Sequence, residues 1–167
     1  MNILEEFKNI TTFVFDMDGV LTDGSLLILS ATEYLRKMDI KDGYAMHVAA
    51  NNGYRMVVIS GSTSDPAITR LHHLGVKDVF MGVPDKKELL LKYIAEHDLN
   101  PLEILYMGDD IPDYGCMGVV GLSCCPADAV SDLKQKVKYI SPFNGGHGCV
   151  RDVIEKVLKL HGKWELN

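Results

Sequence analysis

Short apolar runs alternate with longer amphipathic stretches along the chain, and this alternation limits the possible folds more than any other feature of the sequence. The runs that resemble buried strands lie at 11–15, 56–60, 76–80, 104–107 and 119–123, with an edge piece at 139–140. The helical patterns lie at about 43–52, 65–74, 86–97, 129–137 and 148–160. Strands interleaved with helices in this way are typical of a parallel sheet covered on both faces. We therefore predict a single α/β domain over residues 1–167, a Rossmann-like three-layer sandwich with a mostly parallel central sheet.

The segment after the first predicted strand departs from this alternation. Residues 26–29 and 34–38 are strand-like, and four residues join them, so we predict a β-hairpin inserted at about 25–39. No helical pattern separates this hairpin from the first strand. We therefore expect the hairpin to project from the end of the sheet at which the first strand finishes.

Composition and charge exclude several classes of protein. The chain has 167 residues, 47% of them hydrophobic and 24% charged, which suits one soluble domain with a sizeable core. Its net charge of −6 gives no electrostatic basis for binding nucleic acid or an anionic membrane. Residues 1–8 lack the apolar core of a signal peptide, and no apolar run is long enough to span a membrane. We therefore expect a cytoplasmic protein with neither a nucleic-acid nor a membrane partner.

Reactive side chains recur at, or shortly after, the ends of the predicted strands. In order along the chain they are Asp16, Asp18, Ser60, Lys86, Asp109, Asp110 and Asp113. Successive groups are about one strand–helix unit apart, and ligands of open parallel sheets bind outside the carboxyl ends of the strands. We therefore expect these side chains to converge on one edge of the sheet.

These residue types suit phosphoryl transfer. One carboxylate can attack phosphorus and form an acyl phosphate, and a second, two residues further on, can protonate the leaving alcohol and later deprotonate water. Lys86, the Ser60 hydroxyl and nearby backbone N–H groups can stabilise the charge on the phosphoryl group. Several carboxylates cannot approach a phosphate monoester unless a cation offsets their repulsion, and Mg²⁺ suits such oxygen ligands. The leading hypothesis is therefore a Mg²⁺-dependent phosphatase.

Four motifs in this order resemble the haloacid dehalogenase superfamily of phosphatases. They are D-x-D-G-V-x-T at 16–22, S-G at 60–61, Lys86, and G-D-D-x-x-D at 108–113. The resemblance implies that Asp16 is the nucleophile and a Mg²⁺ ligand. It implies that Asp18 is the general acid and base, and that Asp18 binds the metal through its backbone carbonyl. Asp109 would be the third protein ligand, with Asp110 and Asp113 behind the ligands or linked to the metal through water.

The short hairpin, in place of a mobile cap domain, resembles the small-cap branch typified by 3-deoxy-D-manno-octulosonate 8-phosphate phosphatase. Further matches are V-L-T-D-G at 20–24, I-K-D-G-Y at 40–44, Arg70, and G-G-x-G-x-V-R at 145–151. The resemblance implies a homotetramer in which the hairpins of four subunits assemble and a neighbouring subunit closes each site. It also implies a role in lipopolysaccharide precursor synthesis.

The same resemblance implies which residues contact the sugar. The sugar-contacting stretch falls on Asp39, Ile40, Lys41, Asp42 and Gly43, and the other candidate substrate contacts are His47, Ser62, Arg70 and Lys86. At Ser62, His47 and His147 the family usually has arginine, whose planar fork for a carboxylate neither serine nor histidine reproduces. The expected substrate is a phosphorylated keto-sugar acid. The first candidate is 3-deoxy-D-manno-octulosonate 8-phosphate, and 2-keto-3-deoxynononate 9-phosphate or a related sugar phosphate is the alternative.

Two hypotheses from other classes stay open. A receiver-type module shares the acidic pocket, the hydroxyl and the lysine on a similar sheet, although its paired carboxylates and its phosphorylated residue come in the opposite order. A non-catalytic oligomerisation scaffold is the other. Steady-state release of phosphate with Mg²⁺ separates the three hypotheses, because a receiver would be labelled once and a scaffold not at all.

Overall fold

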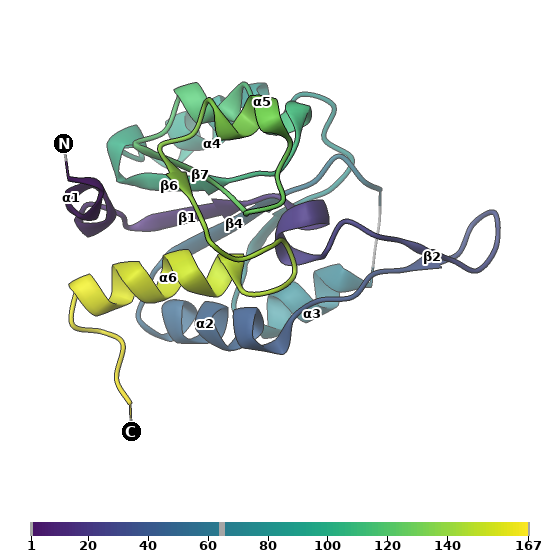
Figure 1. Ribbon diagram of the computed structural model, residues 1–167, viewed down its shortest axis with the longest axis horizontal. Helices are drawn as coiled ribbons and strands as arrows, with labels where there is room; N and C mark the ends of the chain where they lie inside the picture. Colours follow the sequence, from purple (N-terminus) through teal and green to yellow (C-terminus); the bar gives the residue numbers. More distant parts are fainter. Residues whose placement is uncertain (1, 64–65, 167) are drawn as a thin grey trace.

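A computed structural model describes residues 2–63 and 66–166, and within them the predicted α/β architecture is confirmed (Figure 1). Six parallel strands form the central sheet in the order β5-β4-β1-β6-β7-β8. The strands are β1 Thr12–Phe15, β4 Arg55–Ile59, β5 Asp78–Phe80, β6 Ile104–Met107, β7 Leu122–Cys125 and β8 Tyr139–Ile140. The chain builds the sheet outward from β1 first through β4 and then through β6. The carboxyl ends of these three strands therefore meet where the strand order reverses, which is where such sheets bind ligands.

Helices cover both faces of the sheet (Figure 1). One face carries α2 Ile40–Asn51, α3 Ala67–His73 and α6 Cys149–Leu160, and the other carries α4 Lys86–Glu96 and α5 Ser131–Lys134. Side chains alternate along β1, so Phe13 and Phe15 join the core on the first face and Val14 joins the core on the second. Within the described ranges, every helix is too short or too polar to cross a membrane.

The remaining elements are short, and one of them, together with the start of β7, shows what sequence patterns miss. They are α1 Ile3–Lys8 and the helical turns Met17–Leu21, Pro101–Glu103, Ile111–Asp113 and Cys116–Gly118. The sequence did not predict α1, because six residues are too few to show a helical period; Phe7 is buried there against the ring of Tyr139. The strand predicted at 119–123 begins at Leu122 instead. Gly121 packs so tightly against the preceding loop that an added Cβ would lie 2.1 Å from the carbonyl oxygen of Leu102.

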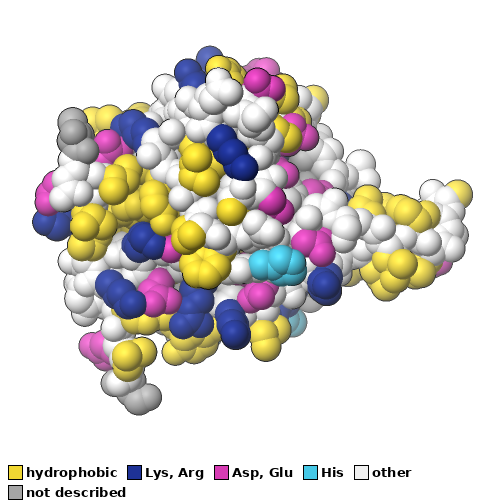
Figure 2. All heavy atoms as spheres, in the orientation of Figure 1, with side chains coloured by type: hydrophobic (Ala, Val, Ile, Leu, Met, Phe, Trp, Pro, Cys, Tyr) yellow, Lys and Arg dark blue, Asp and Glu magenta, His cyan; other side chains and the backbone are white. Residues whose placement is uncertain are grey.

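The predicted hairpin projects from the carboxyl end of the sheet (Figure 1). Its antiparallel strands, β2 Leu27–Ile28 and β3 Tyr34–Leu35, are shorter than predicted, and a bridge between Thr22 and Met38 closes its base. Its large apolar side chains are about half exposed or more, and apolar atoms cover much of the projecting arm in Figure 2; they are Leu26, Leu27, Ile28, Leu29 and Leu35. An arm with this composition has little contact with the core of its own chain.

Candidate active site

The loop after β1 holds two carboxylates in a fixed, compact turn. The N–H of Asp16 donates to the Met107 carbonyl at 3.0 Å and so extends the pairing of β1 with β6. Asp16 Oδ1 then accepts the N–H of Met17 at 2.7 Å. At the other end of the turn, the buried Thr22 hydroxyl oxygen accepts the N–H groups of Gly19 and Gly24 at 3.3 and 3.1 Å. Both ends of the loop are therefore fixed by hydrogen bonds.

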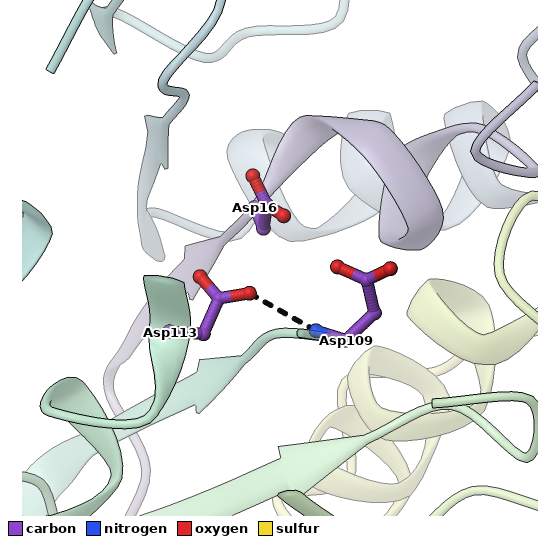
Figure 3. A group of neighbouring side chains, drawn as sticks. All are labelled: Asp16, Asp109 and Asp113. Atoms are coloured by element: carbon purple, nitrogen blue, oxygen red, sulfur yellow. Dashed lines mark hydrogen bonds between the residues drawn. The ribbon is translucent and has the colours of Figure 1, made fainter. Parts of the chain in front are cut away.

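Three carboxylates from two neighbouring strand ends meet beside this loop (Figure 3). One oxygen each of Asp16, Asp109 and Asp113 lies within 4.8 Å of the other two. The close approach requires glycine, because a Cβ on Gly19 would lie 1.9 Å from Asp109 Oδ2 and a Cβ on Gly108 would lie 2.3 Å from Asp113 Cγ. Two oxygen ligands of one Mg²⁺ lie at most about 4.2 Å apart, so the oxygens of the cluster are near the spacing that a shared ion requires.

Asp113 supports the neighbouring residues of the cluster, because hydrogen-bond donors already surround its carboxylate. Oδ1 accepts Lys86 Nζ at 2.8 Å and the Tyr106 hydroxyl at 2.7 Å. Oδ2 accepts the N–H groups of Asp109 and Asp110 at 3.1 and 3.4 Å. Asp113 therefore orients Lys86 and the loop after β6. Of the three carboxylates, Asp16 and Asp109 are the better placed to hold a metal ion.

Lys86 is the one cation in direct contact with this cluster among the described residues. It is the first residue of α4, after the N-cap Asp85, and its side chain is only 5% exposed. Its ammonium group contacts Asp16 Oδ1 at 2.7 Å as well as Asp113. Burial would lower the pKa of Lys86, but the charges of Asp113 and Asp16 outweigh burial and raise it, so the lysine is held in its charged form.

The cluster carries more negative charge than Lys86 offsets. Burial, and then the charge of Asp113, raises the pKa of Asp16 well above its usual value despite the nearby lysine. The same two causes raise the pKa of Asp109 to about 6. Both shifts mean that the site favours added positive charge, and hard oxygen ligands of this kind suit a divalent cation such as Mg²⁺. The residues present therefore fit the predicted cofactor.

Asp18, in the loop after β1, forms a second group of contacts, with Arg36 and Ser62. Arg36, at the base of the hairpin, donates through Nε to Asp18 Oδ1 at 2.7 Å and through Nη2 to Oδ2 at 3.2 Å. The Ser62 hydroxyl donates to the same Oδ2 at 2.8 Å. Partial burial would raise the pKa of Asp18, but these hydrogen bonds outweigh it and lower the pKa below its usual value. The sequence analysis missed Arg36, because nothing in the pattern distinguishes it from its neighbour Lys37.

The predicted phosphate ligand Ser60 lies directly after β4 and is buried. Its N–H donates to the Phe80 carbonyl at 2.8 Å, and its hydroxyl oxygen accepts the Ser62 N–H at 3.2 Å. Ser62 in turn contacts Asp18, so the end of β4 reaches the loop after β1 through one side chain. The Ser60–Ser62 turn is thereby fixed next to the loop after β1.

The predicted sugar contacts lie on the neighbouring helices α2 and α3. Asp39 caps α2 by accepting the N–H groups of Lys41 and Asp42, while Ile40 is largely exposed. Asp42 is buried, and its carboxylate accepts the Arg151 N–H at 2.8 Å at the start of α6. That role leaves Asp42 little freedom to meet a ligand in this structure.

Two further predicted sugar contacts, His47 and Arg70, lie on α2 and α3. The Arg70 guanidinium packs over Gly43, where a Cβ would lie 2.9 Å from it. His47 Nε2 lies 3.1 Å from the Asn51 amide, one turn along α2. Within residues 2–63 and 66–166, neither side chain forms a hydrogen bond or ion pair with the acidic cluster, and their contact with substrate stays a prediction.

Known proteins similar to this chain are phosphatases, in agreement with the chemistry of this site. No family model matches the chain. The 3-deoxy-D-manno-octulosonate 8-phosphate phosphatase of Yersinia pestis is 29% identical over 164 residues, which cover 98% of this chain and 88% of the relative. The crystal structure of a "probable yrbi family phosphatase" of Pseudomonas syringae is 32% identical with a TM-score of 0.92, covering 96% of this chain and 92% of that one.

A second solved structure shows what a relative binds. The 3-deoxy-D-manno-octulosonate 8-phosphate phosphatase of Moraxella catarrhalis, solved with a magnesium ion, a phosphate ion and a KDO molecule, is 26% identical with a TM-score of 0.90. It matches over 95% of this chain and 91% of its own. The fold and the acidic site thus define a phosphoric monoester hydrolase. The chain belongs to the haloacid dehalogenase superfamily of phosphatases. The cluster of Asp16, Asp109 and Asp113 suits the predicted Mg²⁺, and the Moraxella relative was solved with that ion.

We expect Gly19→Ala to lower the rate of phosphate release about a hundredfold or more. The added methyl group would occupy the position of Asp109 Oδ2, and the φ of +86° disfavours any residue with a Cβ. Gly118→Ala is the control, because no atom lies within 4 Å of its added Cβ. Phosphate release with Mg²⁺ and circular dichroism are measured on both variants. Wild-type turnover by Gly19→Ala would show that this contact does not set the site geometry.

Proposed function

We propose that the whole chain acts as a single hydrolase domain, a Mg²⁺-dependent phosphomonoesterase that works through an aspartyl phosphate on Asp16. One observation carries the proposal: Asp16 Oδ1 is held by Lys86 and by the Met17 N–H beside the oxygens of Asp109, while Asp18 stands at the mouth of the same loop. A nucleophilic carboxylate, a cation and a second carboxylate are the parts that a two-step phosphoryl transfer requires.

In the first step an oxygen of Asp16 bonds to phosphorus and the bond from phosphorus to the substrate oxygen breaks. Asp18, which must enter this step in its protonated form, gives that leaving oxygen its proton. In the second step a water molecule attacks phosphorus, Asp18 takes the proton from this water, and the Asp16 carboxylate leaves with phosphate. Lys86, the buried Ser60 and the turn that leads from it to Ser62 stabilise the phosphoryl oxygens during both steps.

Asp16, Asp109 and the backbone carbonyl of Asp18 would hold Mg²⁺, with Asp110 and Asp113 supporting them. Bound there, Mg²⁺ would supply positive charge that offsets the carboxylates and lets a phosphate dianion approach. Asp113 keeps Lys86 charged and aimed at Asp16, and its hydrogen bonds to the N–H groups of Asp109 and Asp110 fix the loop that carries the third ligand.

For the substrate we propose a phosphorylated keto-sugar acid, with 3-deoxy-D-manno-octulosonate 8-phosphate ahead of its nine-carbon relatives. The likeness to the Moraxella enzyme, which was solved with KDO, supports this choice. The candidate sugar contacts are Asp39, Ile40, Lys41, Asp42, Gly43, His47, Ser62 and Arg70. Ser62, whose hydroxyl already contacts Asp18, is the most direct link between a bound sugar and the catalytic loop.

We further propose a cytoplasmic homotetramer that serves lipopolysaccharide precursor synthesis, with a neighbouring subunit closing each site. The exposed apolar side chains of the hairpin support assembly, because a projecting arm rich in leucine and isoleucine gains stability when a second copy covers it. A monomer in light scattering at micromolar concentration would argue against this assembly.

We expect the purified protein to release phosphate from the eight-carbon keto-sugar acid phosphate with a higher kcat/KM than from the nine-carbon one. The measurement compares both with p-nitrophenyl phosphate, with Asp16→Asn as the inactive control and Asp132→Asn, on the exposed side of α5, as the active one. Preference for the nine-carbon substrate would change the sugar but not the chemistry. Near-wild-type turnover by Asp16→Asn would contradict the proposed nucleophile.

We also expect Mg²⁺ to stabilise the fold without any substrate. At a hundred times its dissociation constant a cation bound only by the folded state adds about 2.7 kcal/mol to the free energy of unfolding. Asp109→Asn should lose most of this gain and Asp132→Asn should keep it, as measured by urea unfolding with Mg²⁺ and with EDTA. An equal gain in all three proteins would place the ion elsewhere.

A further inference from the structure

Arg36 reaches the candidate active site from the hairpin rather than from a strand end. It follows β3 directly, and its side chain is only 3% exposed. Its guanidinium lies 5.0 Å from the centre of the ring of Tyr34, two residues earlier in the chain and within β3. The guanidinium is therefore held in place by the hairpin itself.

The contact between Arg36 and Asp18 is of a kind that fixes orientation. Nε and Nη2 each donate to a different oxygen of the carboxylate, at 2.7 and 3.2 Å, which is the two-point geometry of a planar guanidinium. Such a fork determines the plane of the carboxylate as well as its position. The Ser62 hydroxyl is a third donor to this carboxylate, and it donates to Oδ2 at 2.8 Å.

Asp18 is nevertheless open on its other side. Its side chain is 33% exposed, whereas that of Arg36 is buried. Arg36 thus supports the carboxylate from within the protein and leaves its outer face free for water or substrate. A nearby surface cation would not give this arrangement, as the adjacent Lys37 shows. Its side chain is 78% exposed, and its one ion pair among the described residues is with Asp23, at 4.0 Å.

We infer that Arg36 is a positioning residue that holds the carboxylate of Asp18 in the orientation needed to take a proton from the water that attacks the aspartyl phosphate. This inference rests on the proposed function and adds a residue to it. The water's proton passes to Asp18, the water oxygen bonds to phosphorus, and the bond from phosphorus to Asp16 breaks. Arg36 touches none of the reacting atoms and acts only through Asp18.

The inference predicts that the second step slows while the first does not. With p-nitrophenyl phosphate the leaving group needs little protonation, so formation of the aspartyl phosphate depends weakly on Asp18, and kcat/KM reports that first step. Arg36→Ala should therefore lower kcat at least about tenfold, because a misaligned base loses part of its usual 10²–10⁴-fold contribution. Its kcat/KM should stay within about threefold of wild type.

The experiment is stopped-flow release of p-nitrophenolate with Mg²⁺ from the full-length protein. Arg36→Ala should show a burst approaching one equivalent per subunit before a slow steady state, and Arg36→Lys, which keeps the charge but loses the fork, should have an intermediate kcat. Lys37→Ala is the matched control at the next position of the hairpin and should behave as wild type.

Two results would overturn the inference: equal falls in kcat and kcat/KM, which indicate a merely structural role, and unchanged kinetics in both Arg36 variants. If Arg36→Ala fails to fold, Arg36→Lys decides alone, since wild-type kcat in that variant would remove the need for a fork. Absence of Mg²⁺-dependent phosphate release from the wild-type protein would instead remove the proposed function itself.

Discussion

The mutual repulsion of buried carboxylates at one edge of the sheet is the constraint on which the rest of the site depends. Asp16, Asp109 and Asp113 are brought within 4.8 Å by the ends of two adjacent strands, and Lys86 alone contacts them with positive charge among the described residues. Burial makes this arrangement unfavourable, which the raised pKa values of Asp16 and Asp109 express. A fold that retains such a cluster is organised to receive a cation.

The local sequence accommodates this crowding through glycine and through hydrogen bonds. Gly19 and Gly108 stand where any Cβ would collide with Asp109 or Asp113, so both positions are set by the carboxylates they face. Asp113 is stabilised by four donors, two of them backbone N–H groups. These features fix the geometry of the cluster within the segments that follow β1 and β6.

The hairpin connects this chemistry to the outside of the molecule. Its exposed apolar residues suit contact with another subunit, and Arg36 at its base holds the carboxylate of Asp18. In the proposed assembly, one element would therefore both join subunits and orient a catalytic group. That combination gives a physical reason for a short arm in place of a separate cap domain.

Sequence reasoning predicted the sheet and the acidic edge because both depend on local patterns: apolar runs that form strands, and reactive residues directly after them. Both ends of β6, at 104 and 107, were predicted correctly. Contacts that depend on tertiary packing were not predictable. The Tyr106 hydroxyl reaches Asp113, and Asp42 bonds to the backbone at the start of α6, only because helices and strands pack as they do. Arg36 meets Asp18 only because the hairpin turns back toward the sheet.

The account turns on which atom of the protein takes the phosphoryl group. Quenching the enzyme in acid during turnover, followed by peptide mapping with mass spectrometry, measures this directly. We predict that the phosphoryl group is found on Asp16. A phosphoryl group on any other residue, such as Ser60, would contradict the account.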